Sequence, residues 1–215
     1  MTEDSMCNIK HGSPLAKLIQ LSKLIIWDEA PMTHRHCFEA LDRSMRDVLK
    51  YSSHYDASLP FAGKTIVFGG DFRQILPVIP KGTRQNIVHA ALNSSFLWSF
   101  CTVVRLSKNM RLARMAGEPN EPAIQSFADW ILKIGDGAFA ENQNGESLIE
   151  IPDNMIAPMT SDPVDSIVRA IYPDFLTQSD PISYLYSRAI LAPTIDEVEK
   201  VNDYMLSQID SELRT

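Results

Sequence analysis

Two acidic residues, Asp28 and Glu29, directly follow an apolar run that ends at Trp27. Ligands of open α/β sheets bind beyond the carboxyl ends of the strands. In nucleotide-hydrolysing enzymes an Asp placed there holds Mg²⁺, and an adjacent acid orients and deprotonates the attacking water. Neighbours on a strand point to opposite faces, so only a bend at the strand end lets both acids serve one site. The alternative, two solvated acids at a strand terminus, stays open on these letters alone.

A second polar cluster, GGDFRQ at residues 69–74, follows the next apolar run. Paired glycines let the backbone approach a ligand closely. The amide of Gln74 both donates and accepts hydrogen bonds, which suits a sensor of a terminal phosphate and its attacking water. The alternative is a glycine-rich turn in which Arg73 pairs with Asp71. Because two consecutive strands both end in polar clusters, a shared ligand site is favoured.

A third cluster, LSKNMR at residues 106–111, follows another apolar run and ends in Arg111. An arginine delivered to a phosphate site stabilises transition-state charge. Taken alone, a solvated Lys/Arg pair is the more common explanation. Arg111 is therefore a candidate only together with the two preceding clusters.

Gly63, Lys64 and Thr65 spell the end of a phosphate-binding loop, G-x-x-x-x-G-K-[ST]. Five positions before Gly63, however, stands Ser58 instead of glycine. Such a loop also runs from a strand into a helix, whereas this stretch enters a short β-branched run. The sequence therefore predicts a turn entering a buried strand, with Lys64 at the opposite strand end from Gln74.

Apolar runs and helical periodicities predict the elements that position these clusters. Strands are expected at 21–27, 64–69 and 101–106, with a helix capped by Thr33 and ending near residue 50, and a short helix at 94–100. This order implies right-handed crossovers and an α/β fold whose parallel strands are buried on both faces. Further along, we expect helices at 122–134, 164–172 and 196–210, a polar loop at 136–145 and a buried strand at 189–192.

Composition limits the class of protein. The chain has 215 residues, of which 45% are hydrophobic, enough for a packed core. No apolar run approaches the ~20 residues of a membrane span, and the polar first ten residues predict no secretory signal. The three widely spaced cysteines fit a reducing compartment, so an intracellular protein is expected. A net charge of −7 disfavours a broad basic nucleic-acid surface but leaves a local basic groove open.

In combination, the stretches LIIWDEAPM, PFAGKTIVFGGDFRQILPVIP and LSKNMRL resemble the Pif-family DNA helicases, the RecD-like branch of superfamily one. The likeness is greatest to the plant and transposon-associated members. It covers residues 7–112 and 188–205 in order and spacing. It implies a RecA-like parallel sheet with flanking helices at 1–112, carrying motifs II, III and IV. Residues 113–215 would be a linker and the incomplete start of a second RecA-like domain.

The resemblance implies an ATP-dependent 5′-to-3′ DNA helicase that acts in repair, recombination and telomere maintenance, in the nucleus. ATP would be its substrate, Mg²⁺ its cofactor, and single-stranded and forked DNA its partners. By the same resemblance, Asp28 binds Mg²⁺, Glu29 is the catalytic base and Gln74 senses the γ-phosphate. Arg111 matches the arginine of motif IV. Gly70 and Asp71 match the invariant part of motif III and are candidate nucleotide-binding residues, with less defined roles.

The chain also departs from the family pattern. None of the 27 residues before Asp28 reads as G-x-x-x-x-G-K-[ST], and Ile195 stands where the family has Asn. The late motifs would lie beyond Thr215. We therefore expect the middle of a helicase that is inactive alone. The alternative is a catalytically inactive remnant acting as a binding or regulatory module. A non-nucleotide α/β protein would require all three clusters to coincide by chance.

Overall fold

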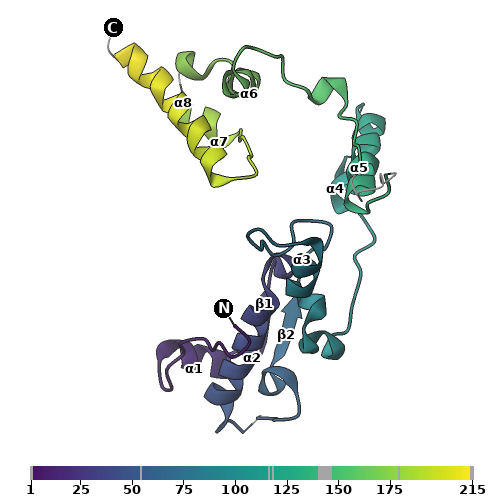
Figure 1. Cartoon of the computed structure of the whole chain (residues 1–215), viewed down its shortest axis with the longest axis vertical. Coiled ribbons are helices and arrows are strands. Elements are labelled where there is room, and N and C mark those ends of the chain that lie inside the picture. Colours follow the sequence, from purple (N-terminus) through teal and green to yellow (C-terminus); the bar gives the residue numbers. More distant parts are fainter. Residues whose placement is uncertain are drawn as a thin grey trace. The chain divides into compact units, whose positions relative to one another are not determined.

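The computed structural model describes residues 2–53, 55–115, 117, 119–139, 147–178 and 180–213. The chain divides into two compact units, Met1–Ser147 and Leu148–Thr215, and each is described by itself (Figure 1). The domain boundary expected between residues 112 and 113 stays a prediction.

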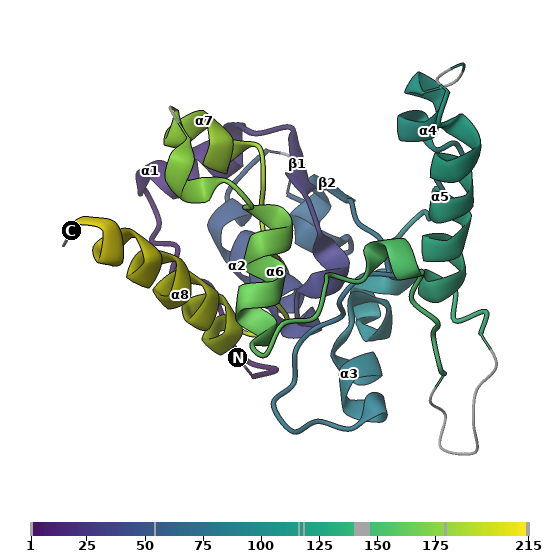
Figure 2. The same ribbon diagram turned by 90° about the horizontal axis from the view of Figure 1, so that it is seen from above.

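The first unit is built on a two-stranded parallel sheet. Strand β1 (Leu24–Trp27) pairs with β2 (Thr65–Phe68) in a register that runs from Leu24 opposite Thr65 to Trp27 opposite Phe68. Helix α2 (Arg35–Leu49) lies in the connection between the strands and beside both of them (Figures 1 and 2). The α/β class and the parallel pairing of the first two predicted strands are therefore confirmed.

The first strand begins later than its apolar run suggests. Helix α1 (Pro14–Leu21) starts after the N-cap Ser13, whose hydroxyl accepts a hydrogen bond from the Ala16 N–H. Pro14 suits the first helical position, where its missing N–H costs nothing. The prediction that the strand starts at residue 21 is wrong, because Leu21 still belongs to this helix and only Leu24 begins the sheet.

The buried face of α2 carries the core. Phe38 and Met45 are fully buried, and the Phe38 ring lies 4.6 Å from the Trp27 ring and 5.2 Å from the Phe68 ring, centroid to centroid. The N-cap of α2 is His34 and not Thr33 as predicted: Nδ1 of His34 accepts a hydrogen bond from the His36 N–H, whereas Thr33 ends the preceding 3₁₀ turn. One aromatic helix residue thus bridges the last residues of both strands.

A buried carboxylate, that of Asp42, connects α2 to the turn before β2. Asp42 is 3% exposed and accepts hydrogen bonds from the Phe61 N–H and from Nε of Arg46. The Arg46 guanidinium also donates a hydrogen bond from Nη1 to the Ala57 carbonyl, at 2.7 Å. These bonds hold the 3₁₀ turn η2 (Pro60–Gly63) against α2, directly before β2.

Only one face of the sheet is covered. Ile25, Trp27, Ile66 and Phe68 pack on the core, while Leu24, Ile26 and Val67 are 48%, 69% and 47% exposed. The expectation of burial on both faces is wrong for the described residues, since α2 and its neighbours cover a single face. Alternation along the two strands explains which side chains are left outside.

The rest of the first unit is helical or extended. It contains η1 (Ala30–Met32), α3 (Arg84–Ala90), η3 (Leu92–Ser94), η4 (Phe96–Phe100), α4 (Met110–Arg114) and α5 (Glu121–Gly135). Helix α3 lies in a stretch for which the sequence analysis named no helix or strand, and it begins with a capping box between Thr83 and Asn86. The short helix expected at 94–100 is present as the 3₁₀ helix η4, and α5 matches its prediction within one residue.

The third predicted strand, 101–106, is not a strand. Its backbone carries no sheet hydrogen bonds, and Val104 and Leu106 are 82% and 100% exposed. Apolar, β-branched residues favour extended backbone, but a strand also needs a neighbour for its N–H and C=O groups. No described segment lies alongside to supply one.

The second unit contains η5 (Asp153–Met155), α6 (Pro163–Ile171), η6 (Phe175–Thr177), α7 (Pro181–Tyr186) and α8 (Ile195–Leu213). Helices α6 and α8 lie side by side, joined by a 2.5 Å hydrogen bond from the Tyr204 hydroxyl to Asp165 (Figure 2).

The buried strand predicted at 189–192 is wrong, because that segment is unpaired and Leu191 is 93% exposed. Residues 140–145 of the polar loop predicted at 136–145 lie outside the described residues. No helix in the described part of the chain has the length and apolar character to cross a membrane.

Substituting Phe38→Ala should lower the free energy of unfolding by about 3–5 kcal/mol, because it leaves a cavity between both strands and α2. The measurement is urea unfolding followed by circular dichroism. Tyr51→Ala removes an aromatic ring that is 87% exposed and is the matched control, with an expected change within about 0.5 kcal/mol. Equal stability of the two variants would contradict the placement of Phe38 in the core.

Candidate nucleotide site at the ends of two parallel strands

Hydrogen bonds join the segments that follow the two strands. The Gly69 N–H donates to the Trp27 carbonyl and the Ala30 N–H donates to the Gly69 carbonyl, both at 2.9 Å. A Cβ at Gly69 would lie 3.5 Å from Oδ1 of Asp28. Asp28 and the glycine pair therefore lie next to each other at the carboxyl edge of the sheet, as the sequence predicted.

The bend required after β1 is present at Glu29. This residue has φ 52° and ψ 36°, the left-handed conformation that few non-glycine residues adopt. Its N–H donates to Oδ1 of Asp28 at 3.0 Å, and both side chains are exposed. The turn ends the strand alternation that would send the two carboxylates to opposite faces.

Gly70 fits a space that a side chain would fill. Its φ is +150°, and a Cβ there would lie 2.3 Å from Cδ and 3.0 Å from Cγ of Pro31. The segments after the two strands are thus in van der Waals contact, and glycine at position 70 is what permits it. This is a structural reason for the glycine, separate from any approach of its backbone to a ligand.

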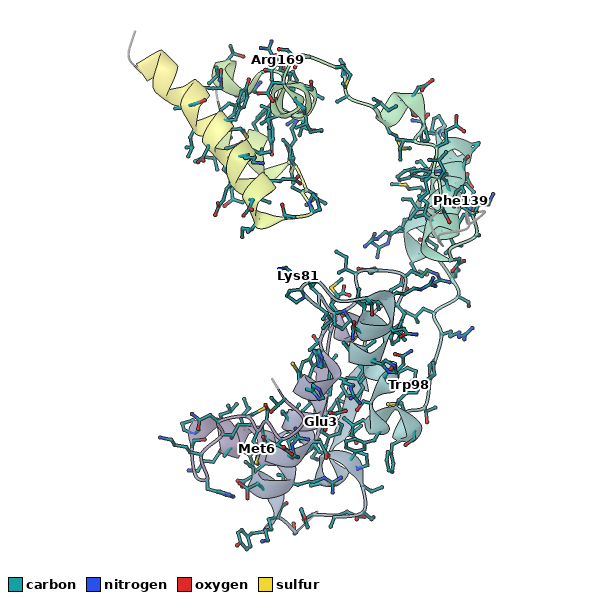
Figure 3. All side chains as sticks on the ribbon, viewed as in Figure 1. Glu3, Met6, Lys81, Trp98, Phe139 and Arg169 are labelled. Atoms are coloured by element: carbon teal, nitrogen blue, oxygen red, sulfur yellow. The ribbon has the colours of Figure 1, made fainter. Side chains whose placement is uncertain are left out.

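Residues 71–74 form a hydrogen-bonded turn. Oδ1 of Asp71 accepts from the Arg73 N–H at 3.0 Å, and the Asp71 carbonyl accepts from the Gln74 N–H at 3.1 Å. The ring of Phe72 packs edge-on against Trp98, 5.8 Å between centroids, and Trp98 is labelled in Figure 3. Gln74 is exposed, and within the described residues no hydrogen bond joins it to Asp28 or Glu29. The common crevice for these groups stays a prediction.

The side chain of Arg73 makes a contact that local sequence did not indicate. It lies 3.8 Å from Oδ1 of Asp71, the expected partner, but its shorter contact is with Asp136, from Nε to Oδ1 at 2.5 Å. The two residues are 63 positions apart, so no periodicity or motif could have paired them. The contact brings the end of α5 to the turn at 71–74.

Arg111 lies in the first turn of α4, whose N-cap is Asn109. The Asn109 side chain accepts hydrogen bonds from the Arg111 N–H at 3.0 Å and from the Leu112 N–H at 3.3 Å. The Arg111 side chain is exposed and, in the described part of the chain, contacts neither carboxylate of the first cluster. Its assignment to the nucleotide site remains a prediction.

The Lys64 side chain binds backbone carbonyls at the end of β2 opposite the GGDFRQ cluster. It stands immediately before β2, whereas the GGDFRQ cluster follows that strand. Its Nζ donates to the carbonyls of Gln20 at 3.2 Å and Ser22 at 2.6 Å, at the C-terminal end of α1. Lys64 of the GKT stretch therefore caps the C-terminal end of α1, where the partial negative charge of the helix terminus favours a cation.

The candidate Mg²⁺ ligand is Asp28. Among the residues that the structure describes, no group of three or more His, Cys, Asp or Glu could enclose a metal ion. Mg²⁺ does not need such a cage, because it is commonly held by one or two carboxylates together with substrate phosphates. An exposed carboxylate at a strand end fits that mode.

A groove of about 600 Å³ lies along α5, where sequence reasoning placed no site. Its lining mixes aromatic, amide and charged side chains: Pro122, Gln125, Ser126, Asp129, Trp130, Lys133 and Phe139, the last labelled in Figure 3. The ring of Trp130 stacks on Phe127, with centroids 5.9 Å apart, and none of the residues of α5 is buried. Helical spacing could have found the aromatic pair, in which Phe127 is exposed and Trp130 half-buried, but not the groove.

Comparison with known families matches residues 1–145 to the PIF1-like helicase model. The match spans the carboxylates, the glycine-rich turn and Arg111. The chain belongs to the PIF1-like helicase family. The comparison with curated proteins gave no match.

Among solved structures, the chain is similar to a Bacteroides Pif1 helicase in complex with ADP-AlF3 and single-stranded DNA, at 20% identity and a TM-score of 0.47. That match covers 65% of this chain and 30% of the Bacteroides chain. A second match, from a study of unwinding at forked double-stranded DNA by two coordinating Pif1 helicases, has 19% identity, covers 59% of this chain and 33% of that one, and has a TM-score of 0.37. The chain thus spans about a third of the length of these helicases.

Substituting Gly70→Ala should lower the free energy of unfolding by about 1–3 kcal/mol, because the new methyl group meets the rigid Pro31 ring from an unfavourable φ. Two matched variants separate the causes. Gly12→Ala has φ +75° and open space, so it carries conformational strain without a clash, and Gly69→Ala meets only ordinary contacts. Urea unfolding should rank Gly70→Ala as the most destabilised. A Gly70→Ala protein as stable as Gly69→Ala would show that the two loops are not in contact.

Proposed function

We propose that this chain carries the nucleotide-hydrolysis centre of an ATP-dependent DNA helicase. The observation that carries the proposal is the register of β1 and β2, which brings Asp28-Glu29 and the GGDFRQ turn to one edge of a parallel sheet. Ligands of such sheets bind at that edge. Family membership supplies the reaction class, ATP hydrolysis coupled to unwinding.

The roles follow from chemistry and position. Asp28 would hold Mg²⁺, whose positive charge would neutralise phosphate charge when ATP is bound. Glu29, beyond the bend, would take the proton of the attacking water. Gln74 would position that water and the terminal phosphate with its amide, and Arg111 would add positive charge in the transition state. Gly70 and Asp71 would hold the turn that presents Gln74.

The finer assignments belong to the same proposal. Single-stranded and forked DNA are the proposed partners, since similar helicases are described in complex with single-stranded DNA or acting on forked DNA. The proposed direction is 5′ to 3′, and the proposed setting is nuclear repair, recombination and telomere maintenance. These follow from the family resemblance.

A second candidate is favoured by one specific observation. The sequence contains no G-x-x-x-x-G-K-[ST], and the Lys64 side chain, the nearest match, is bound to carbonyls of α1. Without a cradle of N–H groups and a lysine, positioning of the β- and γ-phosphates is lost. A catalytically inactive module that binds a partner is therefore the alternative.

The chain as given should release no phosphate from ATP above background, with or without single-stranded DNA, because it lacks that cradle. A version joined to a G-x-x-x-x-G-K-[ST] loop should show DNA-stimulated phosphate release. In that version, Glu29→Gln should lower kcat by about 100-fold or more while ATP still binds, because the amide keeps the shape but cannot accept a proton.

Lys64→Ala in the same version is the matched control. Its kcat is expected to stay within about twofold, since Lys64 binds carbonyls of α1 at the strand end opposite the candidate site and each such hydrogen bond contributes only about 1 kcal/mol to stability. Strong phosphate release by the chain alone would reveal a phosphate site elsewhere. Near-normal turnover by Glu29→Gln would remove Glu29 from the role of base.

A further inference from the structure

The Arg73 side chain leaves the turn at 71–74 and ends at the C-terminus of α5. Asp136, its partner, is the residue that caps this helix. The hydrogen bond that Arg73 donates to the Asp136 carboxylate, together with the negative charge of that carboxylate, raises the pKa of the Arg73 guanidinium. A helix C-terminus also carries partial negative charge, so two features of α5 attract this cation.

The end of α5 has space for this side chain. A Cβ at Gly135 would lie 3.0 Å from Cβ, 3.1 Å from Cδ and 3.4 Å from Cγ of Arg73. The backbone of Gly135 is outside the left-handed region, so its conformation does not call for glycine. Glycine destabilises a helix interior, and the close approach of the Arg73 side chain explains why glycine stands in the last turn of α5.

The ion pair has little weight as a source of stability. The side chains of Arg73 and Asp136 are 49% and 45% exposed, and exposed pairs of this kind contribute little to folding. Its geometric effect is larger. Arg73 is held by Asp71 through its N–H and by Asp136 through its side chain, and Gln74 is the next residue.

We propose that Arg73 is a positioning residue, which by pairing with Asp136 fixes the turn at 71–74 against α5 and so sets the place of the Gln74 amide. The catalytic consequence rests on the proposed function. Phe72 packs on Trp98 and so anchors the turn to the 3₁₀ helix η4. Arg73 supplies the second anchor, at the end of α5. A displacement of α5 therefore moves Gln74, and a misplacement of about 1 Å costs up to about 100-fold in rate.

The link itself is tested on this chain, without ATP. The readout is the ¹⁵N-relaxation order parameter of the Gln74 backbone amide. In the wild-type chain it should be near the rigid value of about 0.85, and Asp136→Asn should lower it toward about 0.6 or less. Asp165→Asn, which disrupts an Arg–Asp pair of similar length in the second unit, is the matched control and should leave it unchanged. An order parameter unchanged by Asp136→Asn overturns the proposal.

The catalytic consequence is tested in the version that carries a phosphate-binding loop. Arg73→Ala should lower kcat by about tenfold with little change in the KM for ATP, because positioning of Gln74 matters in the transition state. Charge exchange, Arg73→Asp with Asp136→Arg, should recover part of the loss relative to Arg73→Asp alone, and Arg169→Ala should have no effect.

A kcat that stays at the wild-type level in Arg73→Ala, or no recovery on charge exchange, would overturn the positioning role. If the unsubstituted version hydrolyses no ATP, the proposed function fails, and the order parameter still decides whether Arg73 fixes the turn.

Discussion

The candidate site depends on one interaction, the parallel pairing of β1 with β2 over the Phe38 ring. Phe38 contacts Trp27 and Phe68, the last residues of the two strands. Because these rings are packed on the same helix residue, the strands end at the same level and the polar clusters that follow begin side by side. The contacts that form the core below the site are therefore also the contacts that align the ends of the two strands.

Two unusual backbone conformations turn those strand ends into a joined pair of loops. Glu29 adopts a left-handed conformation, and Gly70 has φ +150° against the Pro31 ring. Strained residues persist where the surrounding structure over-determines them, and they concentrate at functional sites. Here the hydrogen bonds between Gly69 and its two partners across the sheet edge provide that restraint. Both loops lie within residues 1–145, the part of the chain that matches the PIF1-like helicase family.

Sequence reasoning succeeded where the signal was local. The apolar runs before the two clusters predicted β1 and β2, three- and four-residue spacing predicted α2, and helices were also predicted where α5, α6 and α8 lie. It failed at 101–106 and 189–192, because apolar β-branched residues describe a preference for extended backbone but not the presence of a partner strand. The Arg73–Asp136 pair had no local signature at all, since chain folding alone brings those two residues together. The juxtaposition of Asp28 with Gly69 was predictable, whereas the position of Gln74 depends on long-range contacts.

In the proposed site, one bound metal–nucleotide complex lies against both polar clusters. The most direct measurement uses Mn²⁺ in place of Mg²⁺, with ADP, on ¹⁵N-labelled protein that carries a phosphate-binding loop. The paramagnetic ion should broaden the amide signals of residues 28–30 and 69–74 together. Broadening of only one cluster, or of neither, would contradict a shared site at the ends of the two strands.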